Sequence, residues 1–255
     1  MLNTAPTIAG VHFPFCLMNA AGARSTSREE LLAFAYSEAG AVVTKSITPE
    51  SFLDPGATCG IENPGVDYYV ALLPELRRAG KPIITSVAGL TIDEFITVAQ
   101  TLAAAGVDLI EINLNDPHVH TRVNPFASST RLFEAISTIR QQVSTPLAIK
   151  FPSKIPLPLT EVAQVLLDAQ APAAVCHNSS INGGPSQAQT ILQAVKGKVD
   201  VIGVGGVASG ADALAFLQSG IKALQVATAV MNEGPRAFTR LKHELLGQGE
   251  SHAAL

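Results

Sequence analysis

Short apolar runs alternate with longer amphipathic stretches along the chain, and this alternation restricts the possible folds more than any other feature of the sequence. Eight apolar runs occur, and they begin at Phe15, Gly40, Lys81, Val107, Thr145, Pro172, Asp200 and Lys222. Strands that alternate with helices of about 10 to 15 residues are typical of parallel βαβ units. Eight such units in 255 residues predict one α/β domain over residues 1–255, closed as a single (β/α)8 TIM barrel rather than left as an open sheet.

Local signals agree with this division of the chain. Ser27 with Glu30, and Thr91 with Glu94, have the spacing of capping boxes and predict two helix starts. The segment 49–65 lacks periodicity and is rich in Pro, Gly, Asp and Asn. We therefore expect a loop there, over the end of the barrel at which substrates bind.

Composition and charge exclude several classes of partner. Although 47% of the residues are hydrophobic, no run approaches the ~20 apolar residues that cross a bilayer. A formal net charge of -4 without a basic patch argues against nucleic acid as a partner. The cysteines, Cys16, Cys59 and Cys176, lie far apart and lack metal-ligand spacing. Since the first residues also lack a signal-peptide pattern, we expect a cytoplasmic protein without a metal site.

Polar residues follow the apolar runs, at the ends of the predicted strands where barrel active sites form. They are Asn19, Lys45, Ser46, Ser86, Asn113, Asn115, Lys150, His177, Asn178, Gly205, Gly206 and Thr228. Lys150 and Lys45 each follow apolar residues directly, and a buried lysine is costly unless it meets an anion or another acceptor. The two lysines predict a ligand that is anionic or rich in carbonyl groups, although each ammonium could instead reach water at the strand end.

The final third of the sequence carries the most specific local signal. The run IGVGG, residues 202–206, ends one predicted strand, and LQVATAV, residues 224–230, ends the next. Barrels often bind phosphate with backbone N–H groups after their seventh and eighth strands. The glycine pair would let the backbone approach a phosphate closely. A tight turn alone would explain one GG, but the two segments together favour phosphate binding.

Several motifs in order resemble one known family: MNAAG, VVTKS, NPGVDYY, EINLNDP, LAIKFP, HNSSINGG, IGVGGVASGADAL and VATAVMNEGPRAF. Over nearly the whole chain they resemble the dihydroorotate dehydrogenases, most closely the soluble class 1A members. The resemblance implies a (β/α)8 barrel that binds FMN and oxidises dihydroorotate in pyrimidine biosynthesis. It also implies a cytosolic homodimer that uses the soluble electron acceptor fumarate, with neither nucleic acid nor membrane as a partner.

The resemblance also implies roles for particular residues. Residues that would contact FMN are Ala20, Ala21, Gly22, Lys45, Ser46, Asn113, Lys150, Asn178, Gly205, Gly206, Ala227 and Thr228. Within this set, Lys150 would lie near flavin N1, and the last four residues would hold the phosphate. Residues that would contact the substrate are Asn113, His118, Asn178 and Ser179, with an alignment uncertain by one residue at the Asn-Ser pair.

The segment after the fourth predicted strand departs from the family pattern. Where class 1A members have Asn-Leu-Ser-Cys-Pro-Asn, this chain has Asn-Leu-Asn-Asp-Pro-His, residues 113–118. Asp116 therefore stands at the position of the base that removes the C5 proton, and His118 and Ala57 replace expected asparagines. The loops before Asn63 and after Asn182 are also shorter than in class 1A. Asp116, with Lys45, is the candidate catalytic residue, unless it only caps a turn before Pro117.

Three functions remain open from the sequence. The first is an FMN-dependent oxidoreductase that acts on a CH–CH bond of dihydroorotate or a related small substrate, with Asp116 as base. The second is a lyase or isomerase of phosphorylated sugars in which Lys150 or Lys45 forms a Schiff base. The third is a divergent homologue with little activity that binds FMN or another ligand.

Overall fold

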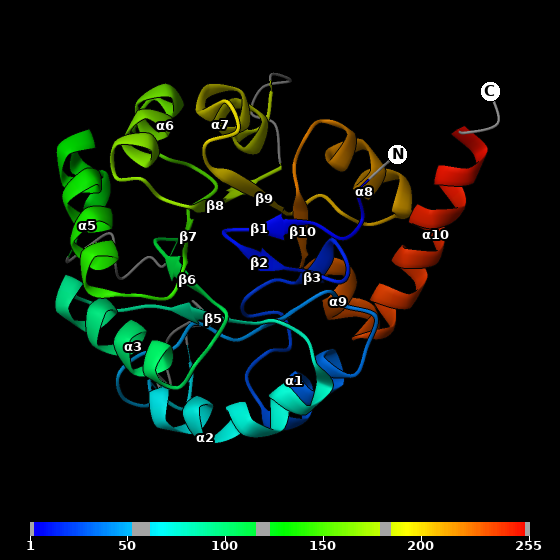
Figure 1. The fold of residues 1–255 in the computed structure, drawn as a ribbon, viewed down its shortest axis with the longest axis horizontal. Helices are drawn as coiled ribbons and strands as arrows, with labels where there is room; N and C mark the ends of the chain where they lie inside the picture. Colours follow the sequence, from blue (N-terminus) through cyan, green and yellow to red (C-terminus); the bar gives the residue numbers. More distant parts are fainter. Residues whose placement is uncertain (1–2, 53–61, 116–122, 179–184, 253–255) are drawn as a thin grey trace.

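The structure is a computed structural model, and it describes residues 3–52, 62–115, 123–178 and 185–252. Eight parallel strands form its main sheet in the order β3-β10-β9-β8-β7-β6-β5-β4 (Figure 1). Their bounds are β3 Leu17–Asn19, β4 Val42–Val43, β5 Ile83–Val87, β6 Leu109–Asn113, β7 Leu147–Lys150, β8 Ala173–His177, β9 Asp200–Val204 and β10 Ala223–Val226. Each strand lies in one of the eight predicted apolar runs, so the predicted α/β barrel is confirmed.

Helices follow the strands and surround them (Figure 1). They are α1 Arg28–Ala35, α2 Val66–Leu76, α3 Ile92–Ala104, α5 Ser129–Gln142, α6 Leu159–Asp168, α7 Gln187–Val195, α8 Gly210–Gln218, α9 Thr228–Glu233 and α10 Arg236–His252, with short 3-10 turns η1 Arg77–Ala79 and η2 Pro125–Ala127. The predicted capping box of Ser27 and Glu30 is present at α1. At α3, Thr91 accepts from the Glu94 amide, whereas the Glu94 carboxylate accepts from Leu90.

The barrel closes between β3 and β4, where a side chain takes the place of a backbone ladder. Over the described ranges, these two strands are not joined by a ladder of backbone hydrogen bonds, unlike the other neighbours in the sheet. Instead, the fully buried Asn19 side chain donates from Nδ2 to the Val43 carbonyl at 2.6 Å and accepts from the Val43 amide at 2.9 Å. An amide side chain has the donor and acceptor of a peptide group, so Asn19 satisfies both backbone groups of Val43.

Two apolar cores follow from the alternation of side chains along the buried strands. Residues such as Met18, Val43 and Leu109 form the cluster inside the barrel. Their strand neighbours, such as Leu17 and Ile110, belong to the larger cluster that includes the apolar faces of the helices. Alternation continues toward the end of each strand. A side chain that follows an interior residue by two positions therefore also points into the barrel, near its mouth.

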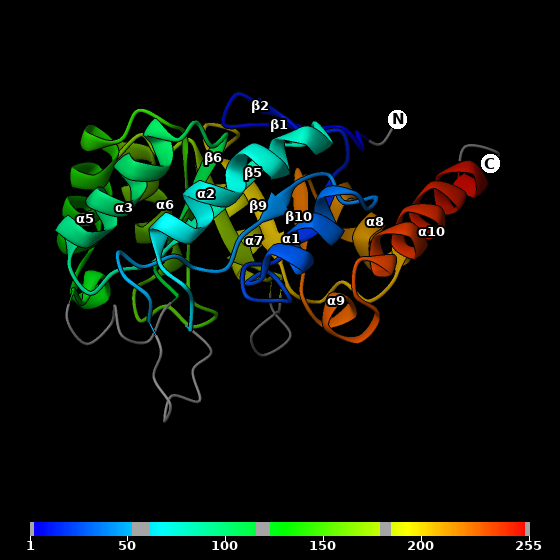
Figure 2. The ribbon, with the colours of Figure 1, turned by 90° about the horizontal axis from the view of Figure 1, so that it is seen from below.

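A two-stranded hairpin, β1 Thr7–Ile8 and β2 Val11–His12, lies at one end of the barrel, and α9 lies at the other (Figure 2). Ile8 belongs to the interior cluster, so the hairpin plugs that end. The Asp200 carboxylate accepts from the Ala9 amide at 2.8 Å and pairs with Lys222 at 2.6 Å. The open end is therefore the one at which the strands finish. Within the described residues, no helix has the length and apolarity to cross a membrane.

Candidate active site

The carboxyl ends of the strands bring several predicted site residues together. Asn113 and Lys150 are the last residues of β6 and β7 and are direct partners in the parallel register. Both are buried, Asn113 at 9% exposure and Lys150 at 5%. Since both follow the interior positions of their strands, they line the same mouth, as the sequence predicted.

The ammonium of Lys150 is held by two interior side chains. It lies 3.1 Å from Oε1 of Glu111 and 3.0 Å from Oε1 of Gln225, to which it donates. Gln225 donates in turn from Nε2 to Oε2 of Glu111 at 2.5 Å. Glu111 and Gln225 are each fully buried. The expected acceptor for the lysine is thus in part a carboxylate of the protein itself.

A chain of hydroxyl groups links the same carboxylate to Asn113. Ser86 donates to Oε1 of Glu111 at 2.9 Å, and the hydroxyls of Ser86 and Ser46 lie 3.1 Å apart. Asn113 donates from Nδ2 to Ser46 at 2.8 Å, while its Oδ1 accepts from the Asn115 amide at 3.0 Å. Ser46 therefore contacts Asn113 directly, and both ends of the Asn113 amide are oriented.

The turn after β3 holds Ala20, Ala21 and Gly22 next to Lys45. The Ala20 amide donates to the Val226 carbonyl at 3.0 Å, which ties this turn to β10. Gly22 has a φ of +93°, and a Cβ added there would lie 3.6 Å from the Lys45 ammonium nitrogen. The structure thus places Lys45 beside the turn with which the sequence grouped it.

The glycine turn after β9 lies beside the end of β10, because these strands are paired up to Val204 and Gln225. Gly205 and Gly206 have φ values of +87° and +73°, and a Cβ added at Gly205 would meet no atom within 4 Å. Ala227 precedes α9 and gives it no side-chain cap. The two predicted phosphate segments are therefore neighbours, with open space at Gly205.

The start of α8, close by in sequence, is already occupied by carboxylates. Asp212 accepts from the amides of Ala208 and Ser209 at 3.0 and 2.9 Å, and Glu244 accepts from the Gly210 amide at 2.7 Å. These anions use the N–H groups that would otherwise attract a phosphate. A phosphate would therefore be held by residues 205–206 and 227–228 rather than by the α8 terminus.

Asn178 and His177 at the end of β8 take different directions. Asn178 packs against β9 and donates from Nδ2 to the Gly205 carbonyl at 2.9 Å, so the structure brings it to the glycine turn. His177 follows the interior residue Val175 by two positions, and its Nε2 is buried with no hydrogen-bond partner among the described residues. Burial and the charge of Lys150 lower the pKa of His177, which keeps the imidazole neutral.

Four residues of the sequence prediction lie outside the described residues: Asp116, His118, Ser179 and Ala57. Their predicted roles stay predictions. Conversely, the sequence prediction omitted Glu111 and Gln225. A signal existed, because each is a polar residue that interrupts an apolar strand, in LIEIN and ALQV, at a position that alternation places inside the barrel.

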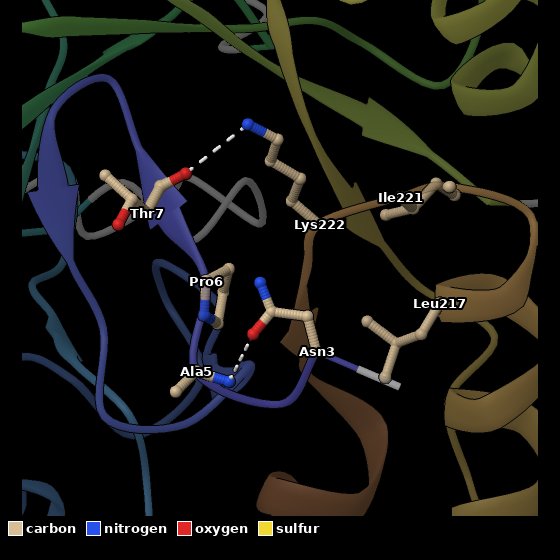
Figure 3. Close-up of a pocket in the computed structure, with 8 residues that line it drawn as sticks. Asn3, Ala5, Pro6, Thr7, Leu217, Ile221 and Lys222 are labelled. Carbon is tan, nitrogen blue, oxygen red and sulfur yellow. Dashed lines mark hydrogen bonds between the residues drawn. The ribbon is translucent and has the colours of Figure 1, made fainter. Parts of the chain in front are cut away.

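A separate cavity of about 420 Å³ lies between the N-terminal segment and the connection from α8 to β10 (Figure 3). It is bounded by Asn3, Ala5, Pro6, Thr7, Leu217, Gly220, Ile221 and Lys222. Lys222 immediately precedes β10, so this cavity is at the amino end of the strand. Barrel active sites form at the opposite end.

The fold is that of a (β/α)8-barrel protein, and Lys150, Asn113 and the glycine turn at the carboxyl ends of its strands form a candidate ligand site. The family model described as dihydroorotate dehydrogenase matches residues 1–190 and 186–248. The chain belongs to the dihydroorotate dehydrogenase family.

Individual relatives agree with this assignment. A Streptococcus uberis protein named "Putative dihydroorotate dehydrogenase A (fumarate)" is 30% identical over 288 residues, covering 96% of this chain and 93% of the relative. A protein of the same name from Streptococcus equi is 29% identical over 289 residues, with the same coverage. The crystal structure of an Eimeria tenella DHODH in complex with ferulenol has a TM-score of 0.82 and 17% identity, covering 98% of this chain and 85% of that one, and supports the fold.

Proposed function

We propose that this protein is an FMN-dependent oxidoreductase that oxidises dihydroorotate, or a closely related small substrate, at a CH–CH bond. The observation that carries the proposal is the buried Lys150, held at the barrel mouth by Glu111 and Gln225 in register with Asn113. Membership of the dihydroorotate dehydrogenase family supports oxidation of dihydroorotate, and the relatives are named as dehydrogenases for this substrate.

The described residues fit FMN in three respects. The glycine turn offers backbone N–H groups and open space at Gly205, and Ala227 and Thr228, which follow the neighbouring strand β10 at the start of α9, lie beside it, which suits a phosphate. Lys150 offers an ammonium where a flavin anion would need a positive charge. Gly22, with a φ of +93°, allows the turn beside Lys45 to adopt a left-handed conformation that other residues rarely take. We infer that these residues hold the phosphate, the ring N1 and the ring face, respectively.

When bound, FMN would supply the hydride-accepting chemistry that no side chain provides. The protein's own contribution is orientation and charge. Asn113, oriented by Ser46 and Asn115, retains a second Nδ2 hydrogen for a ligand at the mouth. Lys150 supplies a fixed positive charge in a site from which apolar neighbours exclude water, and such a charge acts more strongly there than in water.

The paired state of Lys150 argues against a Schiff-base lyase or isomerase. A lysine must lose its proton to attack a carbonyl. The nitrogen of Lys150 instead donates to the fully buried Glu111 and Gln225, so it is engaged within the protein. These contacts argue against the Schiff-base role for Lys150, one of the two lysines that the sequence left open for it.

On the substrate side, the proposal keeps the roles predicted from the sequence. Asp116 removes the proton next to the carbon that loses hydride, and His118, Asn178 and Ser179 contact the substrate with Asn113. The acceptor that reoxidises the flavin is a soluble dicarboxylate such as fumarate, which the names of the relatives include. We further propose a cytoplasmic homodimer, in keeping with the family resemblance.

The test is to purify the protein, load it with FMN and compare it with Asp116→Asn. We expect a yellow protein with one FMN per chain, because the two predicted phosphate segments lie side by side and form one site. Asp116→Asn should bind FMN equally and lose substrate-driven flavin reduction by about 100-fold or more, the scale of general-base catalysis. A protein that cannot be loaded with FMN would contradict the cofactor, and unaltered reduction in the variant would contradict Asp116 as base.

A further inference from the structure

The function proposed above uses Glu111 only as the partner of Lys150, yet this carboxylate contacts Lys150, Gln225 and Ser86 inside the barrel. It is the third of five residues in β6, and its exposure is 0%. A carboxylate in such a place is strongly disfavoured unless it is paired and hydrogen-bonded. The role of this charge, which lies between the apolar residues Ile110 and Ile112, is therefore to be sought in the groups that it contacts.

The contacts of Glu111 cross the barrel. In the order β3-β10-β9-β8-β7-β6-β5-β4, strands β10 and β6 are four places apart. In a closed barrel of eight strands, this separation puts them on opposite sides. The 2.5 Å hydrogen bond from Gln225 on β10 to Glu111 on β6 therefore spans the interior, and Lys150 on β7 completes a triangle with both.

A chain of hydrogen bonds runs from Glu111 through Ser86 and Ser46 to Asn113. The carboxylate at one end and the amide nitrogen at the other fix which group donates in each bond. An ionised carboxylate only accepts, so Ser86 donates to Glu111. Ser86 has no second hydrogen, so its oxygen accepts from Ser46 across the 3.1 Å contact. Ser46 then accepts from the Asn113 amide nitrogen. The charge of Glu111 thus sets the orientation of Asn113, three hydrogen bonds away.

The consequence is a defined set of donors at the barrel mouth. Within the described ranges, two of the three N–H bonds of Lys150 point to Glu111 and Gln225, which leaves one for a ligand. Asn113 has one Nδ2 hydrogen on Ser46 and one for a ligand. The positive charge of Lys150 is also partly offset by the carboxylate 3.1 Å away.

We propose that Glu111 is a positioning residue that fixes Lys150 and Asn113 toward the flavin and lowers the positive charge that the flavin experiences. The inference rests on the proposed FMN function. It predicts that Glu111 sets the flavin redox potential, because a less compensated Lys150 would stabilise the anionic reduced flavin more strongly.

The experiment compares the midpoint potential of bound FMN in the wild type and in Glu111→Gln, by equilibrium reduction with a reference dye. FMN should stay bound, because the phosphate segments are elsewhere. The equilibrium constant for reduction of the flavin should rise about tenfold in Glu111→Gln. For two electrons this corresponds to a midpoint potential about 30 mV more positive. A loaded Glu111→Gln protein with the wild-type potential would overturn the inference. A wild-type protein that cannot bind FMN would instead overturn the function on which it rests.

Two matched variants separate charge from hydrogen bonding. Ser86→Ala cuts the hydroxyl chain but keeps the ion pair, so it should leave the potential near wild type and raise the substrate KM several-fold through Asn113. Glu134→Gln removes an exposed carboxylate on α5 and should change neither quantity. A shift in Ser86→Ala as large as that in Glu111→Gln would contradict the role assigned to the charge.

Gln225→Met provides the test if Glu111→Gln does not fold. It retains both charges and a side chain of similar length but removes the amide that bridges them. Lys150 would then be held less firmly, and FMN affinity should fall several-fold, as measured by quenching of FMN fluorescence on binding. Unchanged affinity together with an unchanged potential would overturn the positioning role.

Discussion

At the scale of residues, Lys150 and Glu111 depend on each other. Lys150→Met should lower the free energy of unfolding by about 3–5 kcal/mol, because Glu111 would remain buried without its cation. The double variant Glu111→Leu/Lys150→Met should be at least about 1 kcal/mol more stable than Lys150→Met alone, since it leaves no unpaired charge. Urea unfolding of the FMN-free proteins measures both. A double variant that is no more stable than Lys150→Met would show that the two charges are not coupled.

His177 gives a pH dependence at the same scale. Burial and Lys150 lower its pKa from the ordinary value of 6.5, so the unfolded chain binds a proton more readily than the folded protein. Above pH 6.5 the imidazole of His177 is neutral in both the folded and the unfolded chain, so it does not reduce the free energy of unfolding. As the pH falls below that value, stability is lost, until the folded imidazole is itself protonated.

Unfolding measured at several pH values tests this prediction. The free energy of unfolding should fall less steeply below pH 6.5 in His177→Gln than in the wild type. His243→Gln, a histidine on α10 that is not buried, should retain the wild-type slope. An identical slope in His177→Gln would exclude His177 as the source.

The sequence predicted Lys150 as a strand-end residue but not the partners that hold it. Lys150 was visible because four apolar residues precede a charge. Glu111 and Gln225 were not paired with it, because residues 39 and 75 positions away meet only when the barrel closes. Asn178 illustrates the same limit: its place at a strand end was predictable, whereas its contact with Gly205 depends on the pairing of β8 with β9.

At the scale of elements, the junction of β3 and β4 depends on one side chain. Asn19→Ala would leave the buried N–H and C=O of Val43 without partners, at a cost of about 2–5 kcal/mol. Asn19→Asp, which retains only the acceptor, should cost less if the carboxylate is protonated at low pH and can then donate. Unfolding measured for both variants checks this order. An Asn19→Ala protein as stable as the wild type would show that the junction has another support.

The eight apolar runs predicted the strands because a parallel strand buried on both faces must be apolar throughout. The same pattern could not predict the closure at Asn19. An asparagine at the end of a strand was interpreted only as a candidate site residue, and its role as a substitute for a backbone ladder depends on two strand ends meeting in space.

In the whole molecule, the two ends of the barrel differ in structure: one is closed, and the other carries the candidate site. The hairpin and the Asp200–Lys222 pair close the amino end, while Lys150, Asn113 and the glycine turn gather at the carboxyl end. The alignment with the Streptococcus uberis relative is 288 residues long, longer than this chain of 255, so the relative has residues that this chain lacks. This agrees with the shorter loops inferred from the sequence and makes the substrate the property most in need of measurement.

We propose that this barrel passes electrons from dihydroorotate to a bound flavin. The direct measurement is to mix FMN-loaded protein with dihydroorotate without oxygen, and to follow both flavin absorbance and orotate. We expect the flavin to bleach as one orotate forms per FMN, and fumarate then to restore the absorbance. Flavin that stays oxidised in the presence of excess dihydroorotate would contradict it.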